Sequence, residues 1–358
     1  MTGTPDPRAI LITGGAGFIG SNLAYRLASE GHRIIVYDAL SRPGVERNLE
    51  WLKSIHRDRI TSIVGDVRDE DQLVRAAADV KAVYHFAAQV AVTTSLVDPR
   101  EDFDINVRGT LNLLDAIRVR GEPVPVIFAS TNKVYGDLAD FELDTLHERY
   151  EPKSFAARRG VAESRALDFH TPYGCSKGAA DQYVLDYCRS FGIPTVVFRM
   201  SCIYGQRQMG TEDQGWVAHF IIRALERQPV TIYGDGRQVR DILDVGDAVE
   251  AYVAALDNID RIAGRAFNLG GGPDNAISLL QLVDEIQSIV GRDVELQFED
   301  WRQGDQRWYV SDTQQARSAL NLHRPRGWRE GVARLAGWLA SERGLELYPE
   351  LHLAGAAE

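Results

Sequence analysis

The chain has 358 residues, of which 44% are hydrophobic and 25% are charged, close to the averages of globular proteins. Its formal net charge of -11 argues against a nucleic-acid-binding protein that works by broad neutralisation of phosphates. No apolar run approaches the roughly 18 residues of a membrane span, and the polar start "MTGTPDPR" lacks the apolar stretch of a secretory signal, so we predict a cytoplasmic protein.

Short apolar runs alternate with longer helical patterns over the first 200 residues. They are "AILIT" (9–13), "RIIVYD" (33–38), "ITSIVGD" (60–66), "AVYHFAA" (82–88), "PVIFAST" (125–131) and "PTVVFRM" (194–200). Continuous apolar strands separated by helices are typical of a parallel sheet that is covered on both faces. The sequence therefore predicts an α/β fold with a doubly wound parallel (Rossmann) sheet.

The pattern loosens after Met200 into segments rich in Gly, Gln and Arg, with scattered helices such as 215–227 and 278–290. A further strand-like run, "AFNLGG" (266–271), is expected to return to the main sheet, so that a smaller second lobe is interleaved with the first. We predict a cofactor-binding domain over 1–200 plus about 242–272, a substrate-binding lobe over about 201–241 plus 273–345, and a tail over 346–358.

The segment 137–171 is rich in charge and long for a loop in a compact domain. It precedes the run "PYGCSK" directly. We favour a solvated excursion over the alternative, a partial lid over a site.

The first predicted strand leads into "GGAGFIG", in which Gly14, Gly17 and Gly20 are spaced three apart before an amphipathic pattern. Such glycines allow a tight turn and a close approach of the backbone to a pyrophosphate, whose charge a helix N-terminus stabilises. The second strand ends in Asp38, where a carboxylate accepts hydrogen bonds from an adenosine ribose and repels a 2'-phosphate. We therefore predict a site for NAD rather than NADP, although Arg42 is close by. A plain glycine turn is the less favoured alternative.

Tyr173 and Lys177 lie four residues apart in "YGCSK", on one face of the predicted helix that continues as "GAADQYVLDYC". A phenol is a poor base at neutral pH, but a nearby ammonium and a positive nicotinamide ring both favour the phenolate. Tyr173 is therefore suited to take a proton from a sugar hydroxyl while hydride leaves for NAD. Alone, such a pair is usually a helix-surface pair, but its position after the fifth strand of a dinucleotide fold favours catalysis.

The sequence resembles the extended short-chain dehydrogenase/reductase family, the NAD-dependent nucleotide-sugar epimerases and dehydratases. The resemblance covers almost the whole chain, through "TGGAGFIG", "NVRGT" (106–110), "ASTNKVYG", "YGCSK", "RDILDVGD" (240–247) and "FNLGGG" (267–272). It implies that Tyr173 is the catalytic base and acid, with Lys177 as its partner. It also implies that the Thr131 hydroxyl bonds the reacting sugar oxygen and that Asn106 is structural; an ordinary strand-end hydroxyl is the alternative for Thr131.

Within this family, the 4,6-dehydratases carry an Asp-Glu pair directly after the catalytic Ser or Thr, because elimination of water needs an additional acid and base. This chain has Asn132 and Lys133 in those two positions. Dehydration is therefore disfavoured, and so is a decarboxylation that relies on the acidic residue. Oxidation, reorientation of the keto sugar and return of the hydride to its opposite face remain, so we predict an epimerase, which is an isomerase.

A closer likeness, to the CDP-tyvelose (CDP-paratose) 2-epimerases, extends through "GRQVRDILDV" and "DQRWYVSD" (305–312). It implies inversion at C2 of a CDP-deoxyhexose through a 2-keto sugar, with a tightly held NAD that is regenerated in each turnover. A UDP-sugar 4-epimerase with the same catalytic residues is the alternative. A non-catalytic NAD-sensing protein is less favoured, because such proteins typically lose the Tyr/Lys pair. Helices beside the catalytic Tyr commonly form a dimer interface in this family, which implies a homodimer or homotetramer.

The glycine loop, the strand ends and the resemblance together predict the residues that bind the cofactor and the substrate. Expected cofactor contacts are Gly14, Gly17, Phe18, Ile19, Gly20, Asp38, Ser41, Asp66, Val67, Phe86, Ala87, Ala88, Gln89, Asn106, Ser130, Tyr173 and Lys177. Expected substrate contacts are Gln89, Thr131, Asn132, Lys133, Arg207, Arg240 and Arg307. Guanidinium groups suit the oxygens of a diphosphate, and Arg207 is the weakest of the three candidates. For the cofactor contacts at the strand ends, such as Asp66 and Ala87, simple strand termination is the alternative. For Arg240 and Arg307 the alternative is a surface or interlobe salt bridge.

The remaining cysteine and histidine residues predict no metal site. Cys175, Cys188 and Cys202 are odd in number and lack C-x-x-C spacing, which disfavours a disulfide framework and a zinc site. His170 and His219 also lack the spacing of metal ligands. Many relatives read "SNNYG" where this chain has "SCIYG" (201–205), so Cys202 and Ile203 replace amides that commonly meet the sugar or the phosphates.

Overall fold

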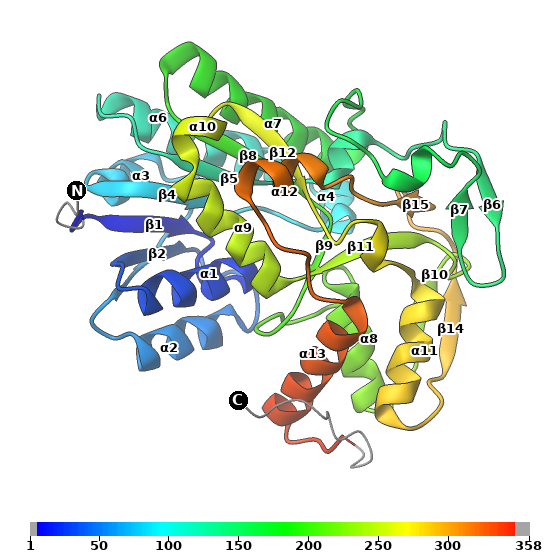
Figure 1. Ribbon diagram of the computed structural model, residues 1–358. Helices are drawn as coiled ribbons and strands as arrows, with labels where there is room; N and C mark the ends of the chain where they lie inside the picture. Colours follow the sequence, from blue (N-terminus) through cyan, green and yellow to red (C-terminus); the bar gives the residue numbers. More distant parts are fainter. Residues whose placement is uncertain (1–5, 348–358) are drawn as a thin grey trace.

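The structure is a computed structural model that describes residues 6–347 (Figure 1). Its centre is a seven-stranded sheet with the order β12-β8-β5-β4-β1-β2-β3, in which every neighbouring pair is parallel. The strands are β1 (Ala9–Thr13), β2 (Ile34–Asp38), β3 (Ile60–Val64), β4 (Val80–His85), β5 (Val126–Thr131), β8 (Thr195–Met200) and β12 (Arg265–Leu269). This confirms the predicted doubly wound parallel sheet and the return of the chain at β12.

Helices cover both faces of this sheet (Figure 1). One face packs against α1 (Phe18–Ser29), α2 (Val45–Ile55) and α9 (Val245–Asp257), and the other against α3 (Glu70–Ala77), α6 (Gly109–Val119) and α7 (Thr171–Phe191). Successive side chains of a strand point to opposite faces. Accordingly, Ile10 and Ile12 of β1 belong to the first core and Leu11 to the second.

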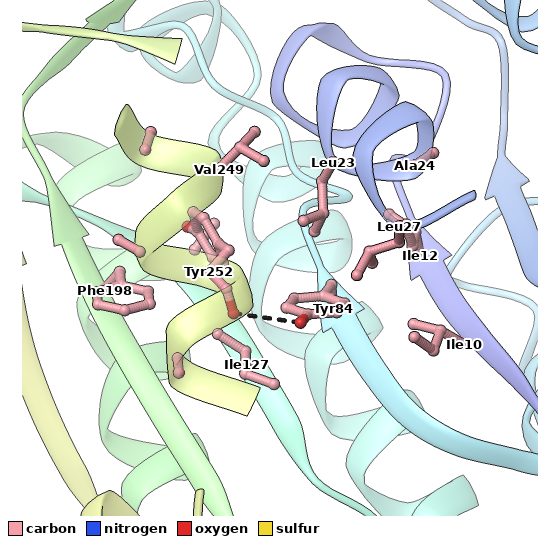
Figure 2. Packing of buried hydrophobic residues seen from close by; sticks show 14 of the residues in the cluster. Ile10, Ile12, Leu23, Ala24, Leu27, Tyr84, Ile127, Phe198, Val249 and Tyr252 are labelled. Carbon is pink, nitrogen blue, oxygen red and sulfur yellow. Dashed lines mark hydrogen bonds between the residues drawn. The ribbon is translucent and has the colours of Figure 1, made fainter. Parts of the chain in front are cut away.

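The first core is dense and aromatic (Figure 2). Leu23 and Leu27 of α1 pack against β1, while Tyr252 of α9 lies between Phe198 and Tyr84. The phenol of Tyr84 donates to the backbone carbonyl of Tyr252 at 3.2 Å, so its polar group is satisfied although the ring is buried. These contacts attach α9, which is distant in the sequence, firmly to the first half of the sheet.

The smaller lobe is built from short strands and three packed helices. Its strands are β9 (Cys202–Tyr204), β10 (Val230–Tyr233), β11 (Val239–Asp244), β13 (Ala276–Ser278), β14 (Leu296–Glu299) and β15 (Trp308–Tyr309). The helices α8 (Trp216–Leu225), α11 (Leu279–Val290) and α13 (Trp328–Arg343) enclose a separate apolar core. The helices expected at 215–227 and 278–290 are α8 and α11.

One later helix packs on the large lobe. Ala316 and Leu320 of α12 (Gln314–Leu320) join the first core, where β12 and α9 lie. The predicted lobe boundaries place this helix in the small lobe, so the chain visits the large lobe once more than those boundaries include. Residues 348–358, most of the predicted tail, lie outside the described residues.

The segment 137–171 forms a hairpin of β6 (Leu143–Thr145) and β7 (Tyr150–Pro152), followed by a short helical turn, η3 (Ala157–Arg159). Its ends are anchored, because Leu138 and Val161 are buried against Trp308 of β15 and its neighbours. The amide of Val161 also donates to the carbonyl of Val310 at 2.7 Å. The segment is therefore docked on the small lobe at both ends.

The remaining short elements are α4 (Val92–Val97), α5 (Pro99–Phe103), α10 (Ile259–Ile262), the π-helical turn η1 (Asp104–Arg108), and the 3-10 turns η2 (Asn132–Tyr135) and η4 (Pro273–Asn275). Both α4 and α5 pack against α7. None of the helices in the described part of the chain is long and apolar enough to cross a membrane.

Candidate active site

A cavity of about 670 Å³ lies between the carboxyl ends of the parallel strands and the small lobe. The central strand β1 pairs with β2 on one side and β4 on the other, which is the switch point where ligands bind in doubly wound sheets. The large-lobe wall consists of the glycine loop, the ends of β2 to β5 and the start of α7. The opposite wall comes from α8, β10, β11 and the loop 302–305.

The glycine loop leaves room for a pyrophosphate. Gly14 has a φ of 68°, and a Cβ on it would lie 2.6 Å from the backbone nitrogen of Ala87. A Cβ on Gly20 would lie 2.3 Å from the carbonyl oxygen of Gly14. The N-terminus of α1, capped by Gly17, has no side-chain cap, so its amides are available to an anion. These features fit the pyrophosphate of a dinucleotide.

Asp38 is positioned at the end of β2 by the same loop. Its carboxylate accepts hydrogen bonds from the amide of Ala16 at 3.0 Å and the amide of Leu40 at 2.9 Å. Burial raises the pKa of Asp38, and these amides oppose the rise. Arg42 lines the cavity beside it, and burial lowers the pKa of that guanidinium.

Further along this edge, Arg68 forms an ion pair with Asp66 at 2.6 Å, which lowers the pKa of Asp66. Sequence reasoning missed Arg68, which comes two residues after the predicted Asp66. The predicted residues Phe18, Ile19, Ser41, Val67, Phe86, Ala87, Ala88 and Ser130 also line the cavity.

The predicted catalytic residues meet where β5 ends and α7 begins. Thr131 is the last residue of β5, Tyr173 lies in the first turn of α7, and Lys177 follows one turn later; all three line the cavity. Burial raises the pKa of Tyr173 to about 12, while a hydrogen bond with Thr131 lowers it. Burial lowers the pKa of Lys177 to about 7, and its ammonium lies 4.2 Å from the centroid of the Phe128 ring. The phenol of Tyr173 and the ammonium of Lys177, whose pKa is near neutrality, therefore lie on the same buried part of the cavity wall.

The structure does not bring Gln89 and Asn106 to the cavity wall. The Asn106 amide nitrogen donates to the carbonyl of Gln89 at 3.1 Å and to the hydroxyl of Ser176 at 3.0 Å, and its oxygen accepts from the amide of Gln89 at 2.9 Å. The Gln89 side chain donates to the carbonyl of Ala91 at 2.8 Å. Both side chains satisfy backbone groups of the loop after β4, which agrees with the structural position expected for Asn106.

The "TNK" run connects β5 to the loop 304–306 of the small lobe. The Asn132 amide donates to Oε1 of Gln306 at 3.1 Å, and Nζ of Lys133 donates to the carbonyl of Gly304 at 2.8 Å. Lys133 and Arg240 both approach Asp305 at 3.8 Å. Burial, with a smaller contribution from the neighbouring Arg240, lowers the pKa of Lys133 to about 8. Lys133 and Arg240 thus form a cationic patch on the cavity wall around one carboxylate.

Two predicted substrate arginines do not line the cavity. The guanidinium of Arg207 lies 4.0 Å from the centroid of the Trp51 ring and 5.5 Å from that of Trp338, so it is held between aromatic rings of the two lobes. The guanidinium of Arg307 lies 5.7 Å from the centroids of the Tyr150 and Trp301 rings. Cation–π contacts engage both guanidinium groups, and neither residue lines the cavity, so their expected role as diphosphate ligands stays a prediction.

Arg302 lines the cavity instead and was missed from the sequence, although it stands in the same run "WRQGDQR". Its guanidinium lies 3.8 Å from the centroid of the Tyr233 ring and donates to Glu212 at 3.2 Å. It also lies 3.6 Å from Asp213. Two arginines in one short basic run were the available signal, but only the fold determines which one points inward.

Cys202 and Ile203 line the cavity, where Nε1 of Trp216 donates to the Cys202 sulfur at 3.4 Å. Burial raises the pKa of that thiol, and all three cysteines are free. His219 also lines the cavity, and burial lowers its pKa. His170 lies elsewhere, with its Nε2 3.1 Å from a carboxylate oxygen of Asp168.

Comparisons with known proteins agree with this architecture. A family model described as the NAD dependent epimerase/dehydratase family matches residues 10–270. The chain is 43% identical to a CDP-paratose 2-epimerase from Salmonella typhi, over 93% of this chain and 99% of that protein. It is similar to the structure of UDP-glucose 4-epimerase from Thermotoga maritima with UDP-glucose, with 30% identity, a TM-score of 0.80 and coverage of 94% and 99%. It is also similar to the UDP-glucose 4-epimerase of Thermus thermophilus in complex with NAD, with 29% identity, a TM-score of 0.77 and coverage of 92% and 98%.

Proposed function

The chain belongs to the NAD dependent epimerase/dehydratase family and is a nucleotide-sugar epimerase, and from that premise we propose that it inverts C2 of a CDP-deoxyhexose. The observation that supports C2 and cytidine is the 43% identity to a CDP-paratose 2-epimerase over nearly the full length of both chains. In this proposal the large lobe binds NAD and the small lobe binds the nucleotide sugar.

The charged groups of the cavity favour epimerisation over elimination. Elimination of water needs an acid and a base besides the tyrosine, and the two positions after Thr131 hold an amide and a cation. The other cavity carboxylates are engaged: Asp38 with backbone amides, Asp66 and Glu101 with Arg68, Glu212 and Asp213 with Arg302, and Asp305 with Lys133 and Arg240. No acid of the described cavity wall is therefore free beside the reacting sugar.

In this proposal three side chains, Tyr173, Thr131 and Lys177, carry out the catalytic steps. NAD, which the glycine loop and Asp38 fit, supplies a hydride acceptor and donor when bound. Tyr173 accepts the proton of the sugar hydroxyl, and the Thr131 hydroxyl bonds the same oxygen and orients it. The ammonium of Lys177 stabilises the phenolate. After the keto sugar has turned its other face, Tyr173 returns the proton to the oxygen, so the enzyme finishes each turnover as it began.

Rotation of the keto sugar requires that the nucleotide stays bound while the hexose turns. Lys133 lies after β5, while Arg240 and Arg302 belong to the small-lobe wall, and all three offer N–H donors to the oxygens of the diphosphate. NAD is proposed to stay tightly bound, since the reaction oxidises and reduces it within one turnover and needs no exchange with NAD in solution.

We also propose that the protein is a homo-oligomer that pairs through α4, α5 and α7. These helices pack together and expose Val97, Phe103 and Tyr183, with Val97 86% exposed. Light scattering on the purified chain tests this, and Val97→Asp is expected to weaken the assembly. A monomer at micromolar concentration would contradict it.

The substrate and the carbon are tested together by NMR. Purified protein is incubated with CDP-paratose, CDP-tyvelose, UDP-glucose and UDP-glucuronate in deuterated water, and the inverted stereocentre is identified. We expect inversion at C2 of the CDP-sugars without deuterium at that carbon, because the hydride returns from the cofactor. Inversion at C4 of a UDP-sugar would instead identify the alternative 4-epimerase. Deuterium at the inverted carbon would require removal of a proton from carbon and would overturn the mechanism.

A further inference from the structure

Gln238 is a buried side chain on the cavity wall that the mechanism above does not use. It stands directly before β11, lines the cavity and is only 4% exposed. Its Nε2 donates to the backbone carbonyl of Tyr233 at 2.7 Å, whereas its Oε1 is buried and has no hydrogen-bond partner among residues 6–347. A carbonyl oxygen only accepts, so the amide nitrogen must face Tyr233 and the oxygen is the atom without a partner. An unpaired buried acceptor is costly, and a ligand with a donor group would satisfy it.

Three such unpartnered atoms of the described residues belong to side chains that line the cavity: Oε1 of Gln238, Oε1 of Gln208 and Oγ1 of Thr93. Thr93 belongs to α4 of the large lobe. Gln208 directly follows Arg207, whose carbonyl accepts from Asn48 of α2 at 3.2 Å, so it also lies beside the large lobe. Gln238 is therefore the one of these three that lies among the small-lobe strands, away from the cofactor side.

The position of Gln238 along the chain indicates which part of the substrate it reaches. Gln238 and Arg240 both line the cavity, whereas Val239 between them packs into a separate apolar cluster. Residues that alternate in this way rise about 3.3 Å each, so the two side chains begin about 7 Å apart on one face. Arg240 and Lys133 both approach Asp305 at 3.8 Å, so Arg240 marks the side of the catalytic strand and Gln238 lies beyond it. With the diphosphate at Arg240, the nucleoside rather than the hexose therefore extends toward Gln238.

The surroundings of Gln238 suit a flat heterocycle. Thr231 and Tyr233 of β10 line the cavity, and the guanidinium of Arg302 lies 3.8 Å from the centroid of the Tyr233 ring. Leu279, the first residue of α11, adds an apolar side chain to the same wall. This part of the cavity thus offers an aromatic ring, an apolar side chain, a hydroxyl and the free amide oxygen of Gln238. In such sites the apolar groups supply contact area, and the few polar groups fix orientation and specificity.

We propose that Gln238 selects cytidine nucleotides, because its Oε1 accepts a hydrogen bond from the exocyclic 4-amino group of cytosine. Uracil carries a carbonyl oxygen at that position, so the amide oxygen of Gln238 would face another acceptor. The Nε2 bond to Tyr233 prevents the amide from turning its donor group toward the base instead. The inference rests on the proposed function and deepens it, since it names the residue that distinguishes a CDP-sugar from a UDP-sugar.

The test measures the binding of CDP and UDP to the purified chain by isothermal titration calorimetry, because the two ligands share their ribose and diphosphate. We expect the wild type to bind CDP about tenfold more tightly than UDP, which leaves the buried acceptor unpaired. Gln238→Met keeps the length of the side chain and removes the acceptor, so it should bind both ligands with nearly equal affinity. Gln238→Glu keeps an acceptor and should retain the preference for CDP, although its charge weakens the binding of both diphosphates. The matched control Gln208→Met removes the other free glutamine oxygen and should leave the ratio of the two affinities unchanged.

A modified ligand tests the same contact in the wild type and does not depend on the folding of a variant. The diphosphate of pyrimidin-2-one riboside lacks the 4-amino group and carries no oxygen in its place. We expect it to bind the wild type about tenfold more weakly than CDP, because it too leaves Oε1 of Gln238 without a donor.

Two results would overturn the inference while the cytidine preference of the wild type stands. One is a ratio of CDP to UDP affinity in Gln238→Met that equals that of the wild type, including an equal loss of both, which would assign Gln238 to the ribose. The other is binding of the pyrimidinone ligand as tightly as CDP. A wild type that does not prefer CDP would instead overturn the cytidine assignment of the proposed function together with the inference. Binding needs no turnover, so none of these results depends on which carbon is inverted.

Discussion

Breaking the ion pair between Arg199 of β8 and Asp181 of α7, at the base of the active site, is expected to destabilise the fold strongly. Their side chains are 5% and 0% exposed. Two nitrogens of Arg199 donate to the two oxygens of Asp181, each at 3.0 Å, and the Ser130 hydroxyl donates to Asp181 at 2.8 Å. Asp181→Asn keeps the volume but removes the charge and turns one acceptor into a donor that faces other donors. Breaking a buried pair in this way costs about 3–5 kcal/mol, because Arg199 stays buried without a counter-charge.

Urea unfolding of the purified chain measures this cost, and the same helix offers a control. Asp186 pairs with Arg189 at 3.7 Å, but these side chains are 50% and 81% exposed. Solvent screens such a pair, so Asp186→Asn should lower the free energy of unfolding by less than about 1 kcal/mol. If Asp181→Asn costs no more than Asp186→Asn, the reasoning about the buried pair is wrong.

Changes in the glycine loop, the catalytic pair and the cationic patch are expected to have separable effects. Gly20→Ala places a Cβ 2.3 Å from the carbonyl oxygen of Gly14, so the glycine loop must shift. We expect the purified variant to lose its NAD, measured after denaturation of the protein. An NAD content equal to that of the wild type would contradict this expectation. Tyr173→Phe removes the proton acceptor, so turnover followed by NMR should fall about 10²–10⁴-fold while NAD content stays, and near-normal turnover would refute the assigned base. Burial moves the pKa of Lys177 from 10.5 to about 7, so between these pH values the unfolded chain binds more protons than the folded chain. In urea unfolding, the wild type should therefore gain stability relative to Lys177→Met as the pH rises through this window, by up to about 1.4 kcal/mol per pH unit. A stability difference that does not depend on pH would contradict the shift. Lys133→Met removes a cation beside Asp305, so KM for the nucleotide sugar should rise about tenfold with a smaller change in kcat; an unchanged KM would restrict Lys133 to tethering the loop at Gly304.

Local patterns predicted the large lobe well, because its elements are specified by short-range rules. Apolar runs bounded by glycines and helical repeats identify buried parallel strands wherever they occur in a chain. The glycine spacing and the acid at the end of the second strand likewise depend only on the geometry of one strand–turn–helix unit. The "TNK" run was informative for the same reason, since the chemistry depends on which groups directly follow Thr131.

The small lobe was harder to predict, because its contacts join distant segments. Nothing local distinguishes Arg302, which lines the cavity, from Arg307, whose guanidinium packs among aromatic rings outside it. Arg207 resembled a ligand in the sequence, but Trp51 and Trp338, from two different lobes, converge on it in the fold. Likewise, no local pattern indicates that the loop 304–305 reaches Lys133, whose ammonium donates to the carbonyl of Gly304.

The sequence by itself determined the parallel sheet, the dinucleotide loop, the tyrosine and lysine pair and the absence of an acid after Thr131, because spacing along one or two adjacent elements specifies each of them. Only the tertiary structure decided which arginines line the cavity and that its carboxylates are already engaged. These features depend on burial and on distances between segments that are far apart in the chain. Electrostatic effects in a protein follow those distances and the exclusion of water, which one-dimensional spacing does not record.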